Sequence, residues 1–329
     1  MLMSVLLALS NPASAAGFQA KTMRAPLSAV EVERGLVIGR GWLELTLAAD
    51  VKPATGAWSR DGEVDTWEHA RWLYTTERAE LRYGIMRRAE LYASFPVHYV
   101  RLTNDALDTD TSTFGIGDPT FGWRLEWLRR PAPLTSIVSD VWFRMPAGSE
   151  SPGTYIGGPN SVSTFVLSTG TADLGVAARG KQQFGPVAVT ASVGYLFRFS
   201  GVTQYVIERE ELQFAGRFKP GNEWLVSLEP MVQLGPVALA CEGALRVRDA
   251  ARTGTTSAGI FVDRYLEVIE GTDGTALDVE PSVTFNLTRG VDVRGAVNVP
   301  LIGEDLMFPL EQVTPTYGLT YSGSVELRY

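Results

Sequence analysis

Stretches in which apolar and polar residues alternate recur along most of this 329-residue sequence. In the last of them, Tyr317 to Tyr329, the apolar residues fall on one face and the polar and charged residues fall on the other. A period of two residues is typical of a β-strand with one apolar and one wet face. The repetition predicts an all-β protein.

The length of these stretches favours a membrane barrel over a soluble sandwich. Thirteen of them alternate clearly, and residues 260–269 form an ambiguous further candidate. Many run to about ten residues, as a tilted membrane-spanning strand requires, whereas ordinary strands average about five or six. Charges recur in the middle of the polar faces, and Tyr and Trp recur near the strand ends, as in the aromatic girdles of membrane barrels. We predict a transmembrane antiparallel up-and-down β-barrel of about 12 to 14 strands over residues 40–329. A soluble β-sandwich is the alternative.

The N-terminal residues carry the features of a targeting segment. Leu2 to Leu9 form a short apolar run, and Ala13-Ser14-Ala15 supplies the small residues that a signal peptidase accepts. Residues 1–15 are therefore predicted to be a signal peptide and residues 16–39 a periplasmic N-terminal tail. No later apolar stretch approaches the length of about 20 residues that a spanning helix requires.

Composition argues against several kinds of partner and chemistry. The single cysteine, Cys241, excludes a disulfide within the chain and a zinc cluster built from thiolates. The formal net charge of -8 argues against nucleic acid as a partner, because phosphate binding needs a basic face. The two histidines, His69 and His98, have no convincing Ser and acid partners, so we expect neither catalysis nor a cofactor.

The end of the chain resembles the terminal strand of bacterial outer-membrane β-barrels, because it finishes on an aromatic residue with apolar residues at every second position before it. In that family the last strand carries the assembly signal and closes the barrel against the first strand. The resemblance implies a location in the outer membrane, with membrane lipid and the barrel-assembly machinery as partners. It assigns the assembly signal to Tyr321, Val325, Leu327 and Tyr329.

A second resemblance rests on Gly115-Ile116-Gly117-Asp118, which leads directly into an alternating stretch, and on the beginning of the first strand at residues 40–45. This pattern resembles the phenol-degradation meta-pathway transporter family, relatives of the FadL-like channels. The resemblance implies a passive channel for small solutes, with hydrophobic or aromatic compounds as the solute class. The alternatives are a structural or adhesion barrel that acts through its extracellular loops without transporting anything, and a lipid-modifying barrel enzyme.

The polar faces of the strands predict which residues face the lumen. Their charges either line a water-filled pore or pair across the lumen and hold a narrow barrel shut. The lumen-lining candidates are Glu44, Arg78, Glu80, Arg82, Glu90, His98, Asp118, Arg124, Glu126, Arg144, Arg198, Glu242, Arg246, Glu280, Arg294 and Glu326.

The connections between strands predict the orientation, because barrels of this class keep short turns in the periplasm and long loops outside. The extracellular segments would be residues 52–70, 104–117, 147–170, 249–275 and 303–315. Within one of them, Asp105, Asp108 and Asp110 are a weak candidate for a calcium site, since Ca²⁺ prefers oxygen ligands. The alternative is an ordinary solvated loop.

Overall fold

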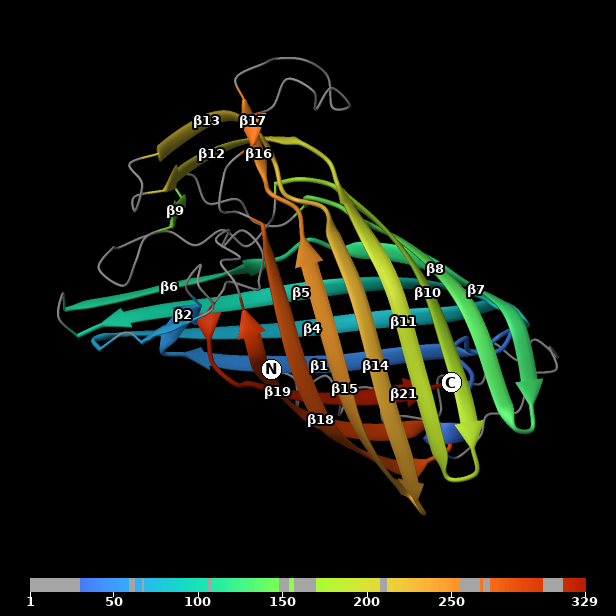
Figure 1. The fold of residues 1–329 in the computed structure, drawn as a ribbon. Coiled ribbons are helices and arrows are strands. Elements are labelled where there is room, and N and C mark those ends of the chain that lie inside the picture. The colour runs from blue at the N-terminus through green and yellow to red at the C-terminus, as the bar shows by residue number, and fades with distance from the viewer. Residues whose placement is uncertain are drawn as a thin grey trace, which may run out of the picture.

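The main element of the computed structural model is an antiparallel sheet that closes on itself (Figure 1). The structure describes residues 30–58, 63–66, 68–105, 108–147, 154–156, 170–207, 212–254, 267–268, 273–303 and 316–329. Twelve strands form the closed wall, which confirms the predicted barrel at the lower end of the expected number. The predicted signal peptide lies outside the described residues.

The wall strands follow one another around the barrel in chain order, and each pairs antiparallel with the next. They are β1 (Leu43–Ala54), β4 (Ala70–Met86), β5 (Ala89–Asn104), β7 (Thr120–Pro131), β8 (Leu134–Arg144), β10 (Asp173–Phe184), β11 (Val187–Arg198), β14 (Glu223–Leu234), β15 (Val237–Arg248), β18 (Gly274–Thr288), β19 (Val291–Gly303) and β21 (Thr320–Arg328).

The last strand closes the barrel against the first, as the terminal pattern predicts. Glu44 of β1 lies opposite Arg328 of β21, and Leu45 lies opposite Leu327. Beyond this register, the amide of Leu43 donates to the carbonyl of Tyr329 at 3.1 Å, and the amide of Tyr329 donates back at 2.8 Å. Closure leaves the wall without an unpaired edge, which a sheet needs in order to cross lipid.

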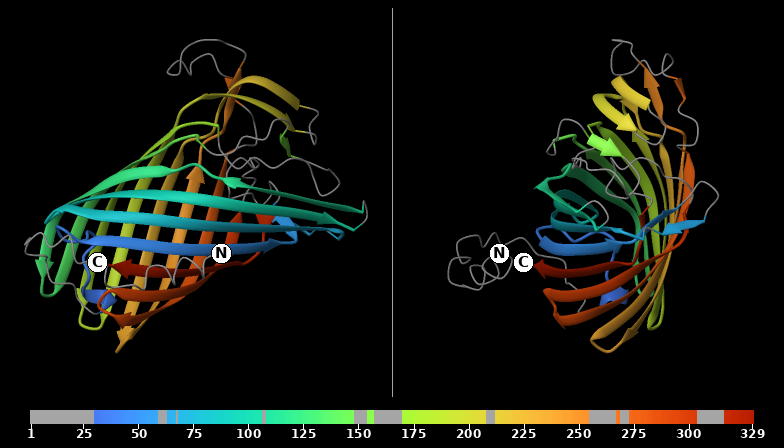
Figure 2. Two further views of the ribbon diagram at one scale, coloured as in Figure 1. Left: turned by 180° about the vertical axis from the view of Figure 1, so that it is seen from behind. Right: turned by 90° about the vertical axis from the view of Figure 1, so that its left-hand side faces the viewer.

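The two ends of the barrel differ. Two-residue turns at 87–88, 132–133, 185–186, 235–236 and 289–290 join the wall strands at one end, which we call the turn end. The long connections lie at the other end, the loop end. A separate five-stranded sheet stands beyond the loop end (Figure 2). It comprises β9 (Thr154–Ile156), β12 (Gly201–Ile207), β13 (Leu212–Lys219), β16 (Arg252–Gly254) and β17 (Glu267–Val268).

This sheet explains why thirteen alternating stretches make only twelve wall strands. The alternating stretch 212–218 falls in β13, which pairs with β12 and β16 and not with the wall. This stretch is one of the thirteen that the sequence assigns to the barrel wall, and that assignment was wrong. Alternation reports that a strand has two unlike faces, but it does not identify the strand's neighbours. Most of the ambiguous stretch 260–269 lies outside the described residues.

The Gly115-Ile116-Gly117-Asp118 motif lies where one strand leaves the wall. β5 pairs with β6 (Thr109–Ile116) at its loop end and with β7 at its turn end, and residues 117–119 separate the two partners. The predicted loop 104–117 thus contains a strand. Among the described residues, β6 pairs only with β5. Residues 56–58, 64–66 and 316–317 form a small separate sheet as β2 (Gly56–Trp58), β3 (Val64–Thr66) and β20 (Thr316–Tyr317).

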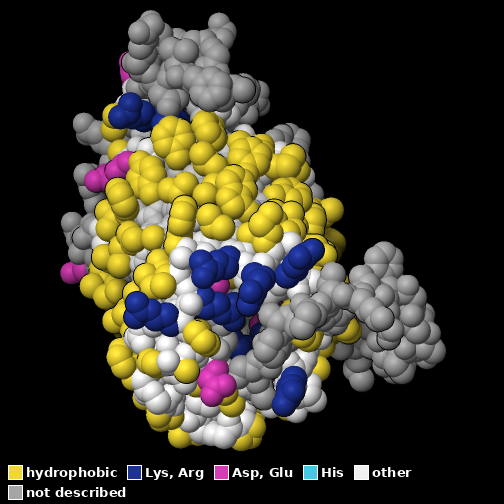
Figure 3. Space-filling model, turned by 90° about the vertical axis from the view of Figure 1, so that its right-hand side faces the viewer, with side chains coloured by type: hydrophobic (Ala, Val, Ile, Leu, Met, Phe, Trp, Pro, Cys, Tyr) yellow, Lys and Arg dark blue, Asp and Glu magenta, His cyan; other side chains and the backbone are white. Residues whose placement is uncertain are grey.

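The outer face of the wall is apolar. Large hydrophobic side chains are exposed on strand after strand, including Leu81, Trp123, Val193 and Leu228. In Figure 3 hydrophobic side chains form a broad yellow area above the Lys and Arg side chains. Within the described part of the chain, no helix is long and apolar enough to cross a membrane. The apolar outside is the surface that a membrane-spanning barrel presents to lipid.

Candidate functional site

A chain of alternating acidic and basic side chains runs around the inner wall. Its members come from eight consecutive wall strands, and each contacts the next across a strand boundary. We call this chain the charge belt. In wall order it consists of Asp292 (β19), Arg328 (β21), Glu44 (β1), Arg82 (β4), Glu90 (β5), Arg124 (β7), Asp140 (β8) and Arg179 (β10).

The first part of the belt crosses the seam where the barrel closes. Arg328 Nε donates to Glu44 Oε2 at 2.7 Å, and its Nη1 donates to Asp292 Oδ2 at 2.5 Å. Arg82 binds Glu44 and also donates from Nε to Glu90 Oε1 at 3.0 Å. Glu44 and Glu90 are almost completely buried, at 1% and 0% exposure. Charges buried to this degree need such partners, so these pairs hold β21, β1 and β4 together on the inside.

The second part of the belt continues from Glu90 to β10. Arg124 donates from Nη1 to Glu90 at 3.0 Å and from Nε to Asp140 Oδ2 at 2.9 Å. The hydroxyl of Tyr92 donates to the other oxygen of Asp140 at 2.7 Å. Arg179 ends the belt with Nη2 at 3.2 Å from Asp140 Oδ2. Every arginine of the belt except Arg179 therefore contacts two of its carboxylates.

Residues 30–39, which we call the inner segment, lie inside the barrel at the turn end. The amide of Glu31 donates to Gln233 of β14 at 3.1 Å, and the amide of Ile38 donates to Glu90 of β5 at 2.7 Å. Lys181 of β10 donates to the carbonyl of Glu31 at 2.8 Å. These strands lie at different points around the wall, so the segment crosses the lumen. The sequence predicts residues 16–39 to be a periplasmic tail; residues 16–29 lie outside the described part of the chain.

Arg34 anchors the inner segment to the belt. Its Nη1 binds Asp292, and the same nitrogen donates to Glu31 at 2.6 Å. Burial by itself would lower the pKa of Arg34, but the neighbouring charges of Glu31 and Asp292 outweigh it and raise the pKa above the ordinary value. The guanidinium therefore stays charged at any physiological pH.

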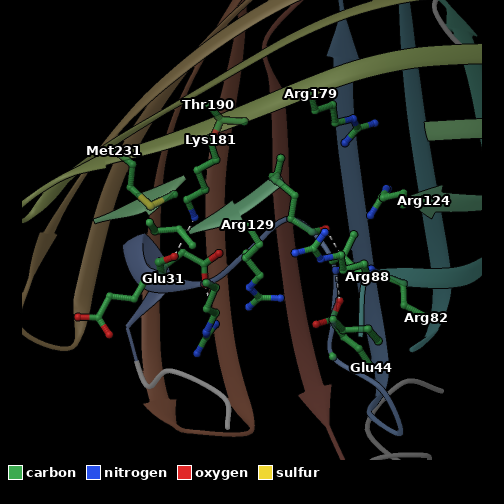
Figure 4. Close-up of a pocket in the computed structure, with 18 of the residues that line it drawn as sticks. Glu31, Glu44, Arg82, Arg88, Arg124, Arg129, Arg179, Lys181, Thr190 and Met231 are labelled. Carbon is green, nitrogen blue, oxygen red and sulfur yellow. Dashed lines mark hydrogen bonds and ion pairs between the residues drawn. The ribbon is translucent and has the colours of Figure 1, made fainter. Parts of the chain in front are cut away.

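A cavity of about 1240 Å³ lies between the inner segment and the wall (Figure 4). Its charged lining consists of ten Arg or Lys residues and six Glu residues. Lys and Arg side chains also gather at the centre of the turn end in Figure 3. The charged residues of the lining are Glu31, Glu33, Arg34, Glu44, Arg82, Arg87, Arg88, Arg124, Arg129, Arg179, Lys181, Glu229, Glu242, Arg294, Glu326 and Arg328.

The predicted lumen residues lie in several different environments. Glu44, Arg82, Arg124, Glu242, Arg294 and Glu326 line the cavity. Glu90 belongs to the belt, and Arg78 and Glu80 share the face of Arg82 on β4, because residues two apart on a strand point the same way. Glu280 pairs with Arg294 at 2.9 Å, Arg246 pairs with Asp278 at 2.5 Å, and Glu126 accepts from the hydroxyl of Ser136 at 2.5 Å.

The remaining predicted residues lie nearer the loop end. Arg198 shares Glu223 with Arg248, at 3.0 and 2.9 Å. Arg144 pairs with Asp173. His98 is buried, with its Nδ1 at 3.0 Å from the hydroxyl of Thr76, and Asp118 is buried at the junction between β6 and β7.

The sequence interpretation missed several charges of the site. Asp140, Arg179 and Asp292 lie on polar faces of alternating stretches, so the period of two contains the signal that identifies them. Arg34 has no comparable signal, because its partner Asp292 is 258 positions away in the chain. Only the closure of the barrel brings these two residues together.

The remaining predicted sites are the calcium candidate and the assembly signal. Among the described residues, no group of three or more His, Cys, Asp or Glu side chains is placed to hold a metal ion. Asp110 of the calcium candidate instead accepts from Arg101 at 2.8 and 2.6 Å, while Asp105 and Asp108 are exposed. Tyr321 and Tyr329 of the predicted assembly signal are both 48% exposed on the outside of the final strand.

Comparison with known proteins supports the fold. No protein-family model and no curated protein matches the chain. The crystal structure of the COG4313 outer membrane channel from Pseudomonas putida F1 is similar, with a TM-score of 0.64 at 12% identity over 89% of this chain and 97% of that one. The translocator domain of the autotransporter NalP from Neisseria meningitidis has a TM-score of 0.45 at 11% identity over 88% of both chains. KdgM porin has a TM-score of 0.43 at 7% identity over 86% of this chain and 98% of that one. The fold is that of a bacterial outer-membrane β-barrel.

Proposed function

We propose that the protein is a passive channel that admits small solutes through the barrel interior. The observation that supports this most strongly is the charged cavity of about 1240 Å³ inside a closed wall with an apolar outside. Such a wall separates a polar interior from lipid, so the lumen is the route for water and polar solutes. A twelve-stranded barrel is also wider than the eight-stranded barrels whose interiors side chains fill.

The solute class of the proposed channel follows from the lining. The cavity lining is rich in guanidinium and carboxylate groups, which favours polar over hydrophobic solutes. Hydrophobic or aromatic solutes are implied by the family resemblance alone and stay a prediction. The rates of uptake of an aromatic hydrocarbon and of a sugar of similar size into the same proteoliposomes would show which class of solute the protein admits faster.

Single-channel recording in planar bilayers tests the proposal. We expect discrete conductance steps from the purified full-length protein, and swelling of proteoliposomes in an isosmotic solution of a small sugar. Folding is checked separately by the altered electrophoretic migration that an intact barrel shows before heating. A folded protein with no conductance and no solute uptake would overturn the proposal.

The second candidate is a barrel that does not transport and acts through its loop end. The inner segment favours it, because it crosses the turn end of the lumen and is fixed there by hydrogen bonds to β5, β10 and β14. The five-stranded sheet beyond the loop end favours it too, since it offers a folded surface outside the wall. Under this candidate, the wild type and a variant with a detached inner segment would both fail to conduct.

A further inference from the structure

Arg179 differs from the other arginines of the charge belt. Arg82, Arg124 and Arg328 each contact two carboxylates of the belt, whereas Arg179 contacts only Asp140 within the part of the chain that the structure describes. The alternation of acid and base thus stops on a cation. A second carboxylate is the group that this position lacks relative to its neighbours.

Both carboxylate oxygens of Asp140 already accept hydrogen bonds from residues other than Arg179. Its Oδ1 accepts from the Tyr92 hydroxyl at 2.7 Å, and its Oδ2 accepts from Arg124 Nε at 2.9 Å before it meets Arg179 at 3.2 Å. The Arg179 side chain is 38% exposed, while that of Asp140 is 0% exposed. Arg179 Nε is buried and has no hydrogen-bond partner among the described residues. Because the side chain is partly exposed and lines the cavity, the exposed part of the guanidinium faces the cavity with donors that Asp140 does not occupy.

The neighbouring strands offer hydroxyl groups where the belt would place an acid. Arg179 lies opposite Ser192 of β11, and Ser192 lies opposite Ser227 of β14. The two hydroxyl oxygens are 2.7 Å apart, and both residues line the cavity. Figure 4 shows Arg179 and Arg124 projecting into the same space. A guanidinium beside two hydroxyls is a set of hydrogen-bond donors that suits an anion.

We infer that Arg179, with the hydroxyls of Ser192 and Ser227, binds the carboxylate group of small anionic solutes in the channel. The inference rests on the proposed function and names its solute class. A carboxylate is planar and accepts from two adjacent guanidinium nitrogens, so it fits the unsatisfied edge of Arg179 better than a spherical anion does. The excess of Arg and Lys over Glu in the cavity lining raises the local concentration of such anions.

Ion selectivity gives the first test. In planar bilayers with a KCl gradient, we expect the wild type to pass chloride in preference to potassium. Arg179→Gln should lower the ratio of chloride to potassium permeability about fourfold, because one unit charge at about 10 Å from the ion path in water changes the concentration of each ion about twofold and in opposite directions. Arg179→Lys keeps the charge and should keep the ratio. Arg101→Gln is the matched control, because Arg101 is exposed on β5 and does not line the cavity.

Thermal unfolding in detergent gives a second test that does not depend on conduction. At fixed ionic strength, we expect succinate to raise the melting temperature of the wild type, whereas uncharged succinamide should not. Arg179→Gln should weaken the binding of succinate about tenfold or more, as the loss of a hydrogen bond to a charged group would. Arg101→Gln should bind succinate as the wild type does.

The two tests separate the inference from the proposed function. A conducting protein whose permeability ratio is the same in Arg179→Gln would overturn the anion site and leave the channel intact. A protein that binds succinate through Arg179 without conducting would overturn the channel and leave the anion site. Stabilisation by inorganic phosphate and not by succinate would overturn the assignment to carboxylates.

Discussion

The charge belt, which runs from β19 through β21 and β1 to β10, holds its carboxylates buried beside arginines, whereas in the middle of β14 and β18 the inner wall leaves carboxylates partly exposed. In the belt, Glu44 and Glu90 have side-chain exposures of 2% and 0%, and Arg82 has 15%. On the other part of the wall, which we call the looser wall, Glu229 and Glu280 are 20% and 25% exposed. Their common partner Arg294, which projects from β19, is 38% exposed, at 4.0 Å from Glu229 and 2.9 Å from Glu280.

The register explains part of this difference. Glu242 of β15 lies directly opposite Glu280 of β18, and like charges opposite one another on a sheet repel. In the belt, Glu44 lies opposite both Arg82 and Arg328, and its one like-charge neighbour pair, Asp292 opposite Glu326, has Arg328 bound to both carboxylates. One region of the wall therefore uses its charges to fix neighbouring strands and the inner segment, and the other leaves its charges available to water and solutes.

Deleting residues 327–329 should have the largest effect, because it breaks the belt and the seam together. The deletion removes Arg328, its bonds to Glu44 and Asp292, and the two main-chain bonds between Leu43 and Tyr329. We expect little or no folded barrel in the outer membrane, measured by the altered gel migration of the unheated protein. Arg328→Gln, which keeps the main chain, should fold in part. Normal insertion of the deletion variant would contradict the role of the final strand.

The replacement of a belt arginine should destabilise the barrel much more than the same change in Arg294, the partner of the looser wall's carboxylates. Arg82→Met leaves two buried carboxylates, Glu44 and Glu90, without one of their partners. The free energy of unfolding should fall by about 3 to 5 kcal/mol, as for other broken buried ion pairs. Arg294→Met is the matched control, and it should cost less than about 1 kcal/mol because its partners are partly solvated. Urea unfolding in lipid vesicles measures both; equal losses would remove the distinction between the two regions.

Detaching the inner segment should change conductance more than stability. Arg34→Gln removes the ion pairs with Glu31 and Asp292 and leaves the wall strands paired. A charge-assisted hydrogen bond contributes about 1.5 to 3 kcal/mol. Its loss should therefore raise the population of a state with the segment out of the lumen by a factor of about ten or more. Single-channel recordings should show longer dwell in a higher conductance level. Arg40→Gln, at an exposed position just after the segment, is the control. It should show the same conductance levels and dwell times as the wild type.

The smallest effect is expected outside both regions. Arg101 and Asp110 form an exposed pair near the loop end, with side-chain exposures of 46% and 56%. Solvent screens such pairs, so Arg101→Gln should change neither urea unfolding nor conductance measurably. A clear change in conductance would place the loop end on the solute path.

The period of two identified both the kind of strand and which side chains lie on each face. Residues such as Glu44, Arg82, Glu90 and Arg124 could be named from the sequence because each lies on the polar face of a long alternating stretch. The same signal misassigned residues 212–218, since β13 alternates as clearly as a wall strand does while pairing elsewhere. It also missed Lys181 of β10, which lies two residues beyond Arg179 and therefore on the same polar face.

The sequence by itself determined the strands, their two faces and a terminal strand suited to closing a barrel, because these depend on local alternation. Only the tertiary structure decided which strands join the wall, how its charges pair and where residues 30–39 lie. Arg328 and Glu44 are 284 positions apart, and Arg34 and Asp292 are 258 positions apart. No local pattern encodes such pairs, since they form only when the ring of strands closes and brings the two ends of the chain to one place.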